Sequence, residues 1–146
     1  MKIYVASSWR NERQQSVVEA LRRAGHEVYN FKHPAEGDNG FHWSDLDPDW
    51  QNWTPEQYVE KLKHPIAESG FGKDFNAMKW ADCCVVVLPC GRSAHSEAGW
   101  MKGQGKPTVI LLDKVEPELM YKMFDLVAVD LLQVLNYVSE LSAVGV

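Results

Sequence analysis

Short apolar runs alternate with amphipathic segments along this chain. The runs that predict strands cover residues 2–6, 27–31, 83–88, 107–112 and 126–129. Segments with helical spacing or helix-end signals lie between and after them, over about 11–24, 66–80, 93–103, 116–123 and 131–141. The run at 83–88 is apolar at every position, which is typical of a parallel strand that is buried on both faces. The alternation predicts an α/β protein with a mostly parallel five-stranded sheet.

Helices on both faces of such a sheet make a three-layer fold of the flavodoxin-like or Rossmann-like kind. In the segment at 66–80 we expect Ile66, Phe71, Phe75 and Met78 to face inward. A chain of 146 residues is the usual length of one domain. We therefore predict a single domain over residues 1–146 that carries one long insertion.

The insertion covers about residues 32–65 and holds three of the six tryptophans, Trp43, Trp50 and Trp53. Its last part, Thr54-Pro55-Glu56-Gln57, has an N-cap, a proline at the first helical position and a capping glutamine. Long loops are often functional, so the tryptophans can form a lid that stacks on a flat ligand. They can equally cover a core edge or a subunit interface.

Composition narrows the possible partners. The net charge of −5 argues against binding to a nucleic-acid polymer, although a pocket can still be locally positive. No apolar run approaches the length of a membrane span, and the first residues predict a strand rather than a secretory signal. The three cysteines, two of them adjacent in an apolar strand, suggest buried thiols in a reducing compartment. We expect a cytoplasmic protein without membrane contact.

The segment from Cys90 to Trp100 is the most informative in chemical terms. It follows the apolar strand at 83–88, and Ser93 suits the N-cap of the helix that it opens. Glu97 would then lie in the first helical turn, at the carboxyl end of a strand, where open α/β sheets bind ligands. The helix dipole would favour its ionised form, which can attack an electrophilic sugar carbon. The alternative is an acidic residue that only complements the dipole.

Other polar groups follow the first strand. Ser7, Ser8, Trp9 and Arg10 precede a helix, and their hydroxyls, guanidinium and backbone amides suit a phosphate or a sugar hydroxyl. The alternatives are a plain N-cap for Ser8 and a solvated charge for Arg10. No glycine-rich fingerprint supports a dinucleotide fold or a P-loop, and no pair of histidines has the spacing of a metal site.

A family resemblance rests on several of these residues. They are the opening Ile3-Tyr4-Val5-Ala6-Ser7-Ser8-Trp9-Arg10, Asp74, the pair Ala81-Asp82, and Ser96-Glu97-Ala98-Gly99-Trp100 followed by Gly105-Lys106-Pro107. In this order they resemble the nucleoside 2-deoxyribosyltransferase family. The resemblance covers most of the chain but leaves out the tryptophan-rich insertion.

The resemblance implies roles for particular residues. Glu97 matches the nucleophile, which attacks C1′ of a ribose or deoxyribose, and Tyr4 and Asp74 match residues that line the pocket. Asp74, or a water that it holds, would protonate the leaving base. The family also contains nucleoside 5′-monophosphate N-glycosidases, and the positions that hold the phosphate there are Ser7, Ser8, Arg10, Gly91 and Ser93 here. No metal or organic cofactor is implied.

One departure affects the choice of reaction. Deoxyribosyltransferases usually carry an aspartate six residues before the nucleophile, and this chain has Gly91 there. The departure favours hydrolysis, or an altered base preference, over base exchange. We expect an enzyme that cleaves or transfers the N-glycosidic bond of a nucleoside or its 5′-monophosphate, acts as a homodimer or higher homo-oligomer, and stacks Trp43 on the base. The alternatives are a non-catalytic nucleotide-binding module and a protein-interaction module that uses the tryptophan-rich loop.

Overall fold

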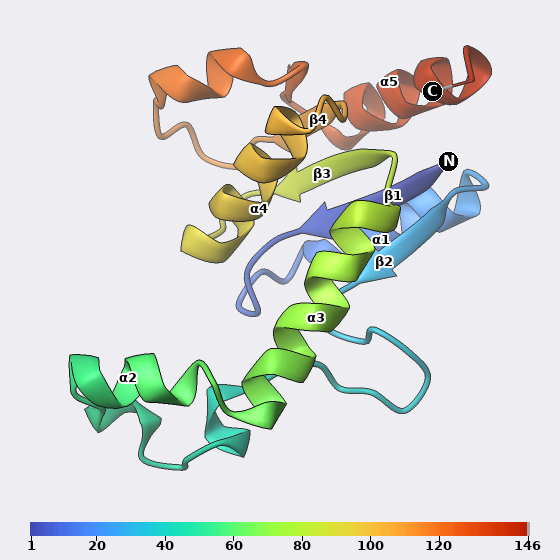
Figure 1. The fold of residues 1–146 in the computed structure, drawn as a ribbon. Helices are drawn as coiled ribbons and strands as arrows, with labels where there is room; N and C mark the ends of the chain where they lie inside the picture. Colours follow the sequence, from blue (N-terminus) through green and yellow to red (C-terminus); the bar gives the residue numbers. More distant parts are fainter. Residues whose placement is uncertain (146) are drawn as a thin grey trace. The chain divides into compact units, whose positions relative to one another are not determined.

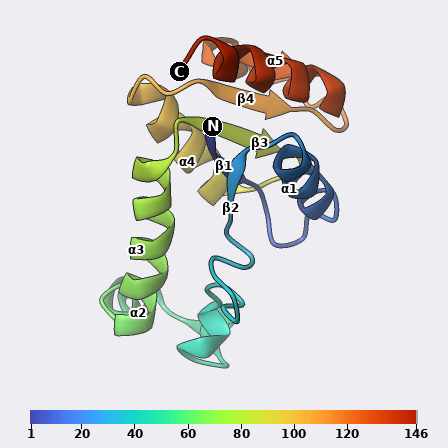
Figure 2. The same cartoon turned by 90° about the vertical axis from the view of Figure 1, so that its right-hand side faces the viewer.

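The computed structural model describes residues 1–145 and divides into two compact units. The first unit consists of Met1–Asn30 together with the chain from Trp80 onward, and the second is Phe31–Lys79. Figure 1 shows the sheet and its helices in the first unit, and Figure 2 the irregular segment that leaves the second strand and runs to the helices of the second unit. The prediction of one domain over the whole chain stays a prediction.

The first unit is built on a five-stranded sheet in the order β2-β1-β3-β4-β5. Its strands are β1 (Lys2–Ala6), β2 (Glu27–Asn30), β3 (Cys83–Val87), β4 (Thr108–Leu111) and β5 (Leu126–Ala128). Every neighbouring pair is parallel, with Ile3 opposite Cys83 and Val85 opposite Val109. The predicted α/β fold with a parallel five-stranded sheet is therefore confirmed.

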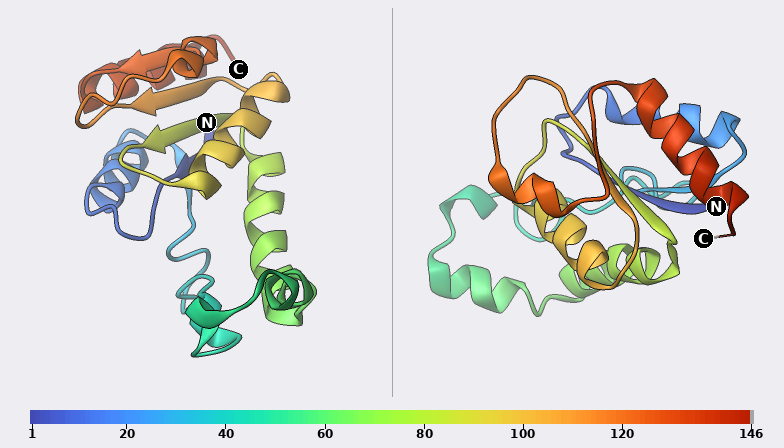
Figure 3. Two further views of the ribbon diagram at one scale, coloured as in Figure 1. Left: turned by 90° about the vertical axis from the view of Figure 1, so that its left-hand side faces the viewer. Right: turned by 90° about the horizontal axis from the view of Figure 1, so that it is seen from above.

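Helices cover both faces of this sheet, which gives the three predicted layers (Figure 3). On one face, α1 (Gln14–Arg23) and α5 (Leu131–Ala143) pack against alternate strand residues such as Ile3 and Val85. On the other face, α4 (Arg92–Gly103) packs against β1, β3 and β4. Because successive strand residues point to opposite faces, Tyr4 belongs to the layer of α4.

The second unit contains two helices, α2 (Pro55–Lys61) and α3 (Pro65–Trp80), after the short 3₁₀ turns η1 (Trp43–Asp45) and η2 (Trp50–Asn52). The predicted capping box is present, since Gln57 N donates to Thr54 Oγ1 at 3.2 Å and Thr54 N to Gln57 Oε1 at 2.8 Å. Trp43 lies at the centre of an aromatic cluster with Phe41, Trp53 and Tyr58, at ring-centroid distances of 4.7, 5.8 and 6.0 Å. Edge-to-face packing of this kind holds the segment before α2 against α2, although none of the four rings is fully buried.

Several predicted boundaries and orientations are wrong. Helix α1 begins at Gln14 rather than near residue 11, because the side chain of Asn11 accepts hydrogen bonds from the N–H groups of Arg13 and Gln14. The segment predicted as a helix over 116–123 is a 3₁₀ helix, η3 (Leu119–Met123). On α3, Ile66 and Phe71 are 41% and 66% exposed instead of facing inward.

The buried side chains of α3 are Ala67, Ala77 and Met78, so its apolar pattern does not form one continuous stripe. Along the residues that the structure describes, no helix is long and apolar enough to cross a membrane.

Candidate active site

Glu97 lies on the face of α4 that packs on the sheet. The helix begins at Arg92 with Gly91 as its N-cap, because Gly91 is extended and the chain turns helical directly after it. The prediction that Ser93 is the N-cap is therefore wrong, and Glu97 lies in the second helical turn rather than the first. The helix dipole acts mainly on groups in the first turn, so it contributes little to stabilising the negative charge of Glu97. Glu97 shares one face of α4 with Ala94, Ala98 and Met101, which are all buried, and for this reason its side chain points toward the sheet.

Tyr4 meets Glu97 across the layer. The Tyr4 hydroxyl donates a hydrogen bond to Oε2 of Glu97, although the two residues are 93 positions apart in the chain. The phenol ring is 1% exposed and stacks on Tyr29 of β2, with ring centroids 5.5 Å apart. Because the Tyr4 ring is buried and stacked, its hydroxyl is held in one position. The hydroxyl in turn holds one carboxylate oxygen of Glu97.

The loops after β1 and β3 are tied together at the carboxyl edge of the sheet. The Ser7 hydroxyl donates to the carbonyl of Val87 at 2.8 Å. The side-chain amide of Asn11 donates to the carbonyls of Val87 and Pro89, at 3.0 Å each. Asn11 is 3% exposed and also holds the start of α1, so it fixes both loops at once. Sequence reasoning misses this role of Asn11, because the two loops that Asn11 joins are more than 70 residues apart.

The predicted phosphate-binding residues stand on these two loops but differ in availability. Ser7 uses its one hydroxyl hydrogen on Val87, which leaves it only acceptor capacity toward a ligand. The Ser8 hydroxyl accepts from the N–H of Arg10 at 3.2 Å, so its own hydrogen can be donated. Arg10 is exposed, as are Gly91 and Ser93 at the start of α4, and Trp9 is 41% exposed. The exposed groups among them are accessible to an anion from solution.

A second cluster joins the β3–α4 turn to η3. His95 Nδ1 lies 2.8 Å from the carbonyl of Gly91, and His95 Nε2 lies 2.7 Å from the hydroxyl of Tyr121. The rings of His95 and Tyr121 are nearly parallel. Nothing in the sequence pattern points to this contact, because Tyr121 follows 26 residues after His95, in a different predicted element. His95 thus holds the turn that precedes Glu97.

Cys90 lies next to this cluster, with its sulfur 3.6 Å from His95 Nδ1. Burial, together with the negative charge of Glu97, raises the pKa of the Cys90 thiol to about 11. The thiol is therefore protonated near neutral pH and is a poor nucleophile. Among the described residues, no group of three histidine, cysteine, aspartate or glutamate side chains is placed to hold a metal ion.

Lys106 and Asp82, two further residues of the family resemblance, make hydrogen bonds to the backbone. Lys106 Nζ donates to the carbonyl of Ala81 at 2.6 Å and so satisfies a backbone group just before β3. Asp82, which directly precedes β3, accepts a hydrogen bond from the N–H of Lys2 at the start of β1, at 3.2 Å. Gly99 is not needed for a close approach, because a Cβ there would meet no atom within 4 Å.

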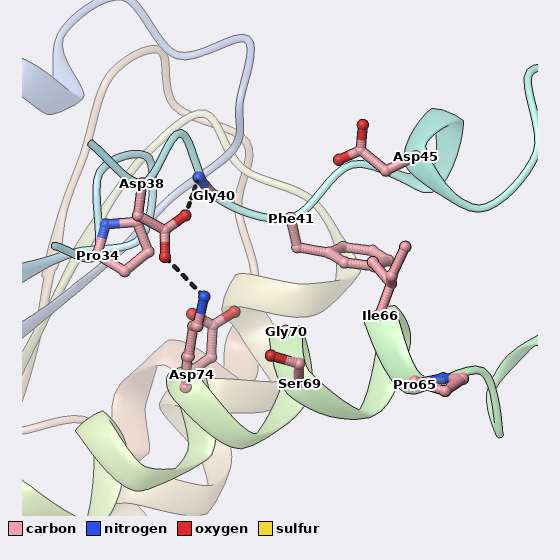
Figure 4. Close-up of a pocket in the computed structure, with 11 residues that line it drawn as sticks. Pro34, Asp38, Gly40, Phe41, Asp45, Pro65, Ile66, Ser69, Gly70 and Asp74 are labelled. Carbon is pink, nitrogen blue, oxygen red and sulfur yellow. Dashed lines mark hydrogen bonds and ion pairs between the residues drawn. The ribbon is translucent and has the colours of Figure 1, made fainter. Parts of the chain in front are cut away.

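Asp74 and Trp43 belong to the second unit. Asp74, on α3, lines a cavity of about 260 Å³ within that unit, which we call the insertion cavity (Figure 4). Trp43 is packed into the aromatic cluster, with three rings around it. The predicted roles of both residues in binding a substrate remain predictions.

Comparison with known proteins supports the architecture. No protein-family model matches this sequence, and no curated protein matches it. Among solved structures, a 2-deoxyribosyltransferase from the psychrotolerant bacterium Bacillus psychrosaccharolyticus superimposes with a TM-score of 0.58. The two are 22% identical, and the match covers 94% of this chain and 92% of the other. At this identity the likeness shows a shared fold.

Proposed function

We propose that this protein cleaves or transfers the N-glycosidic bond of a nucleoside or a nucleoside 5′-monophosphate, with Glu97 as the nucleophile. The observation that carries the proposal is the hydrogen bond from the buried Tyr4 hydroxyl to the Glu97 carboxylate. A surface carboxylate that only complemented the helix dipole would not face a buried tyrosine on β1, an interior strand of the sheet. The fold shared with a 2-deoxyribosyltransferase supports the same reaction class.

The chemistry follows from the position of the carboxylate. One oxygen of Glu97 forms a bond to C1′ as the C1′–N bond to the base breaks, through an oxocarbenium-like transition state. The leaving base takes a proton from water or an acidic side chain. Water, or a second base, then attacks C1′ and releases Glu97. Tyr4 holds Oε2 throughout and so acts as a positioning residue for the nucleophile.

The loop groups support a preference for the 5′-monophosphate. Arg10 and the Ser8 hydroxyl are available to an anion, and the first N–H groups of α4 lie on the adjoining loop. Gly91 offers no carboxylate to a second base, so we favour water as the acceptor. The homo-oligomer and the cytoplasmic location stay predictions.

The test is a chromatographic screen of nucleosides and their 5′-monophosphates, each with and without a second free base. We expect release of a free base, and Glu97→Gln should abolish it because the amide cannot act as an anionic nucleophile. Glu140→Gln, an exposed carboxylate on α5, is the matched control and should keep full activity. Activity of Glu97→Gln within a few-fold of the parent protein would rule out this mechanism.

A second variant tests the phosphate. Arg10→Ala should weaken binding of the monophosphate by roughly 1.5–3 kcal/mol, the range for hydrogen bonds to charged groups, and should change nucleoside binding much less. Equal losses for the two ligands would mean that Arg10 does not recognise a phosphate. Ligand binding without any base release would instead favour a non-catalytic nucleotide-binding module.

A further inference from the structure

The chain between β4 and β5 contacts one flank of α4 at two places. Near the start of the helix, Nε2 of His95 lies 2.7 Å from the hydroxyl of Tyr121, which belongs to η3. In the last turn, Nζ of Lys102 donates to Oδ1 of Asp125 at 2.9 Å. Because His95 and Lys102 are two helical turns apart, they share this flank, and Glu97 lies on another face of the helix. The first of the two contacts reaches the turn at which α4 begins.

The partners of His95 set the direction of its hydrogen bonds. A carbonyl oxygen only accepts, so Nδ1, which lies 2.8 Å from the carbonyl of Gly91, carries the ring hydrogen. In the neutral ring, Nε2 is then an acceptor for the hydroxyl hydrogen of Tyr121. Burial raises the pKa of Tyr121, so this hydroxyl keeps its hydrogen near neutral pH. Tyr121 thus fixes both the tautomer and the orientation of the His95 ring.

The carbonyl that His95 holds belongs to the peptide group at which α4 begins. Its oxygen also accepts from the backbone N–H of His95 at 3.3 Å, so one residue supplies two donors to it. The peptide group between Gly91 and Arg92 is trans and planar, and its C=O and N–H bonds point in opposite directions. Because the carbonyl of Gly91 is held toward His95, the N–H of Arg92 points out of the N-terminal end of the helix.

This N–H is available to an anion. The first N–H groups of an α-helix have no acceptor within the helix, and Gly91, the N-cap, has no side chain that could accept from them. The neighbouring loop after β1 carries Arg10, and Asn11 ties that loop to the β3–α4 loop through two hydrogen bonds of 3.0 Å. Since Asn11 holds the β3–α4 loop from one side and His95 from the other, the amide of Arg92 has a fixed direction.

We propose that His95, oriented by Tyr121, is a positioning residue that sets the preference for a 5′-phosphorylated sugar by aiming the first N–H groups of α4 at the phosphate. This inference rests on the proposed function and adds the side chains that determine its specificity. Neither His95 nor Tyr121 is among the residues that carry the family resemblance. Because Glu97 lies on another face of α4, a change at His95 alters the binding of the phosphate and not the chemical step.

The experiment titrates the full-length protein with ribose 5-phosphate, which has the sugar and the phosphate of the proposed substrate but no base to release. Binding is followed by the amide chemical shifts of Arg92 and Ser93. His95→Ala should raise the dissociation constant about fivefold or more, which corresponds to one hydrogen bond between neutral groups. His95→Asn keeps a donor in the place of Nδ1 and should bind within about threefold of the parent protein. Tyr121→Phe keeps the ring and should raise the dissociation constant about two- to threefold.

Lys102→Met is the matched control, because it removes the other contact between α4 and the same connection, away from the turn. It should bind ribose 5-phosphate within about twofold of the parent protein. An equal loss of affinity in Lys102→Met and His95→Ala would show a general loosening of α4 and overturn the proposal. Unchanged affinity in His95→Ala, or no shift of the Arg92 and Ser93 amides in the parent protein, would also overturn it.

Kinetics separate this inference from the proposed function. On a monophosphate found by the base-release screen, His95→Ala should raise KM about fivefold and leave kcat within about twofold, whereas Glu97→Gln abolishes base release. A fall in kcat with an unchanged KM would mean that His95 acts on the nucleophile instead and would refute its role in phosphate binding. Binding of ribose 5-phosphate that depends on His95, in a protein that releases no base from any substrate, would support the positioning role and refute only the proposed reaction.

Discussion

Removal of one oxygen atom, by Tyr4→Phe, tests the contact on which the candidate site depends. The phenol ring is 1% exposed and stacks on Tyr29, so phenylalanine keeps the packing of the layer. The variant therefore removes the hydroxyl that donates to Glu97 and keeps the ring that stacks on Tyr29. Its effect can be measured on folding stability, before any substrate is known.

The magnitude follows from the charge of the acceptor. A hydrogen bond to a charged group contributes roughly 1.5–3 kcal/mol and one between neutral groups roughly 0.5–1.5 kcal/mol. Tyr4→Phe should thus lower the free energy of unfolding by about 1.5–3 kcal/mol when Glu97 is present. In a Glu97→Gln background the same change should lower it by only about 0.5–1.5 kcal/mol, because the acceptor is now a neutral amide.

The assay is urea denaturation of the four proteins of this double-mutant cycle, followed by tryptophan fluorescence at neutral pH. The difference between the two backgrounds is the coupling energy of Tyr4 with Glu97. A coupling below about 0.3 kcal/mol, the scatter expected for independent sites, would refute the contact. On a substrate found by the base-release screen, Tyr4→Phe should also lower kcat, because the nucleophile is no longer held by its Oε2.

Two further predictions concern the second unit and the thiols. In urea titrations, Gly70→Ala should lower the free energy of unfolding by about 1–3 kcal/mol, because the new Cβ overlaps Phe41. The control Gly72→Ala should raise it by up to about 1 kcal/mol, because the new Cβ meets no atom within 4 Å and alanine favours the helix. Alkylation of Cys90 should be slow at pH 8 and rise toward pH 11, since burial and Glu97 raise its pKa to about 11, and it should be faster in Glu97→Gln; equal rates would contradict a charge effect.

The sheet could be predicted because its signals are local. The all-apolar run of β3 and the apolar run of β1 each indicate a buried parallel strand without reference to the rest of the chain. Both strands end within one residue of their predicted ends. The capping box at Thr54 is equally local, since its two hydrogen bonds join residues three apart. Each of these features is decided by neighbours in the sequence.

The site could be predicted only in part, because its contacts join distant residues. The position of Glu97 after a buried strand indicates a functional residue. Its side chain faces the sheet because it lies on the buried face of α4, and its partner Tyr4 is 93 residues away in the chain. Gly91, rather than Ser93, is the N-cap of α4 because its backbone is extended, which no residue type in the segment signals. Trp43 packs with other rings, and the composition of the insertion, which leaves a lid and a core edge equally open, does not reveal those partners.

The position of the second unit within the chain bears on the order of folding events. Phe31–Lys79 separates β2 from β3, so the central pair of β1 and β3 forms between segments about 80 residues apart. Such parallel pairing is slow, because the intervening chain loses conformational entropy before the stabilising contacts between the strands have formed. If the aromatic cluster around Trp43 lets the second unit collapse first, the flexible length to be closed falls by about half, which lowers the entropic barrier by about 0.6 kcal/mol. Variants that loosen that cluster should therefore refold more slowly, even though none of its rings lies in the sheet.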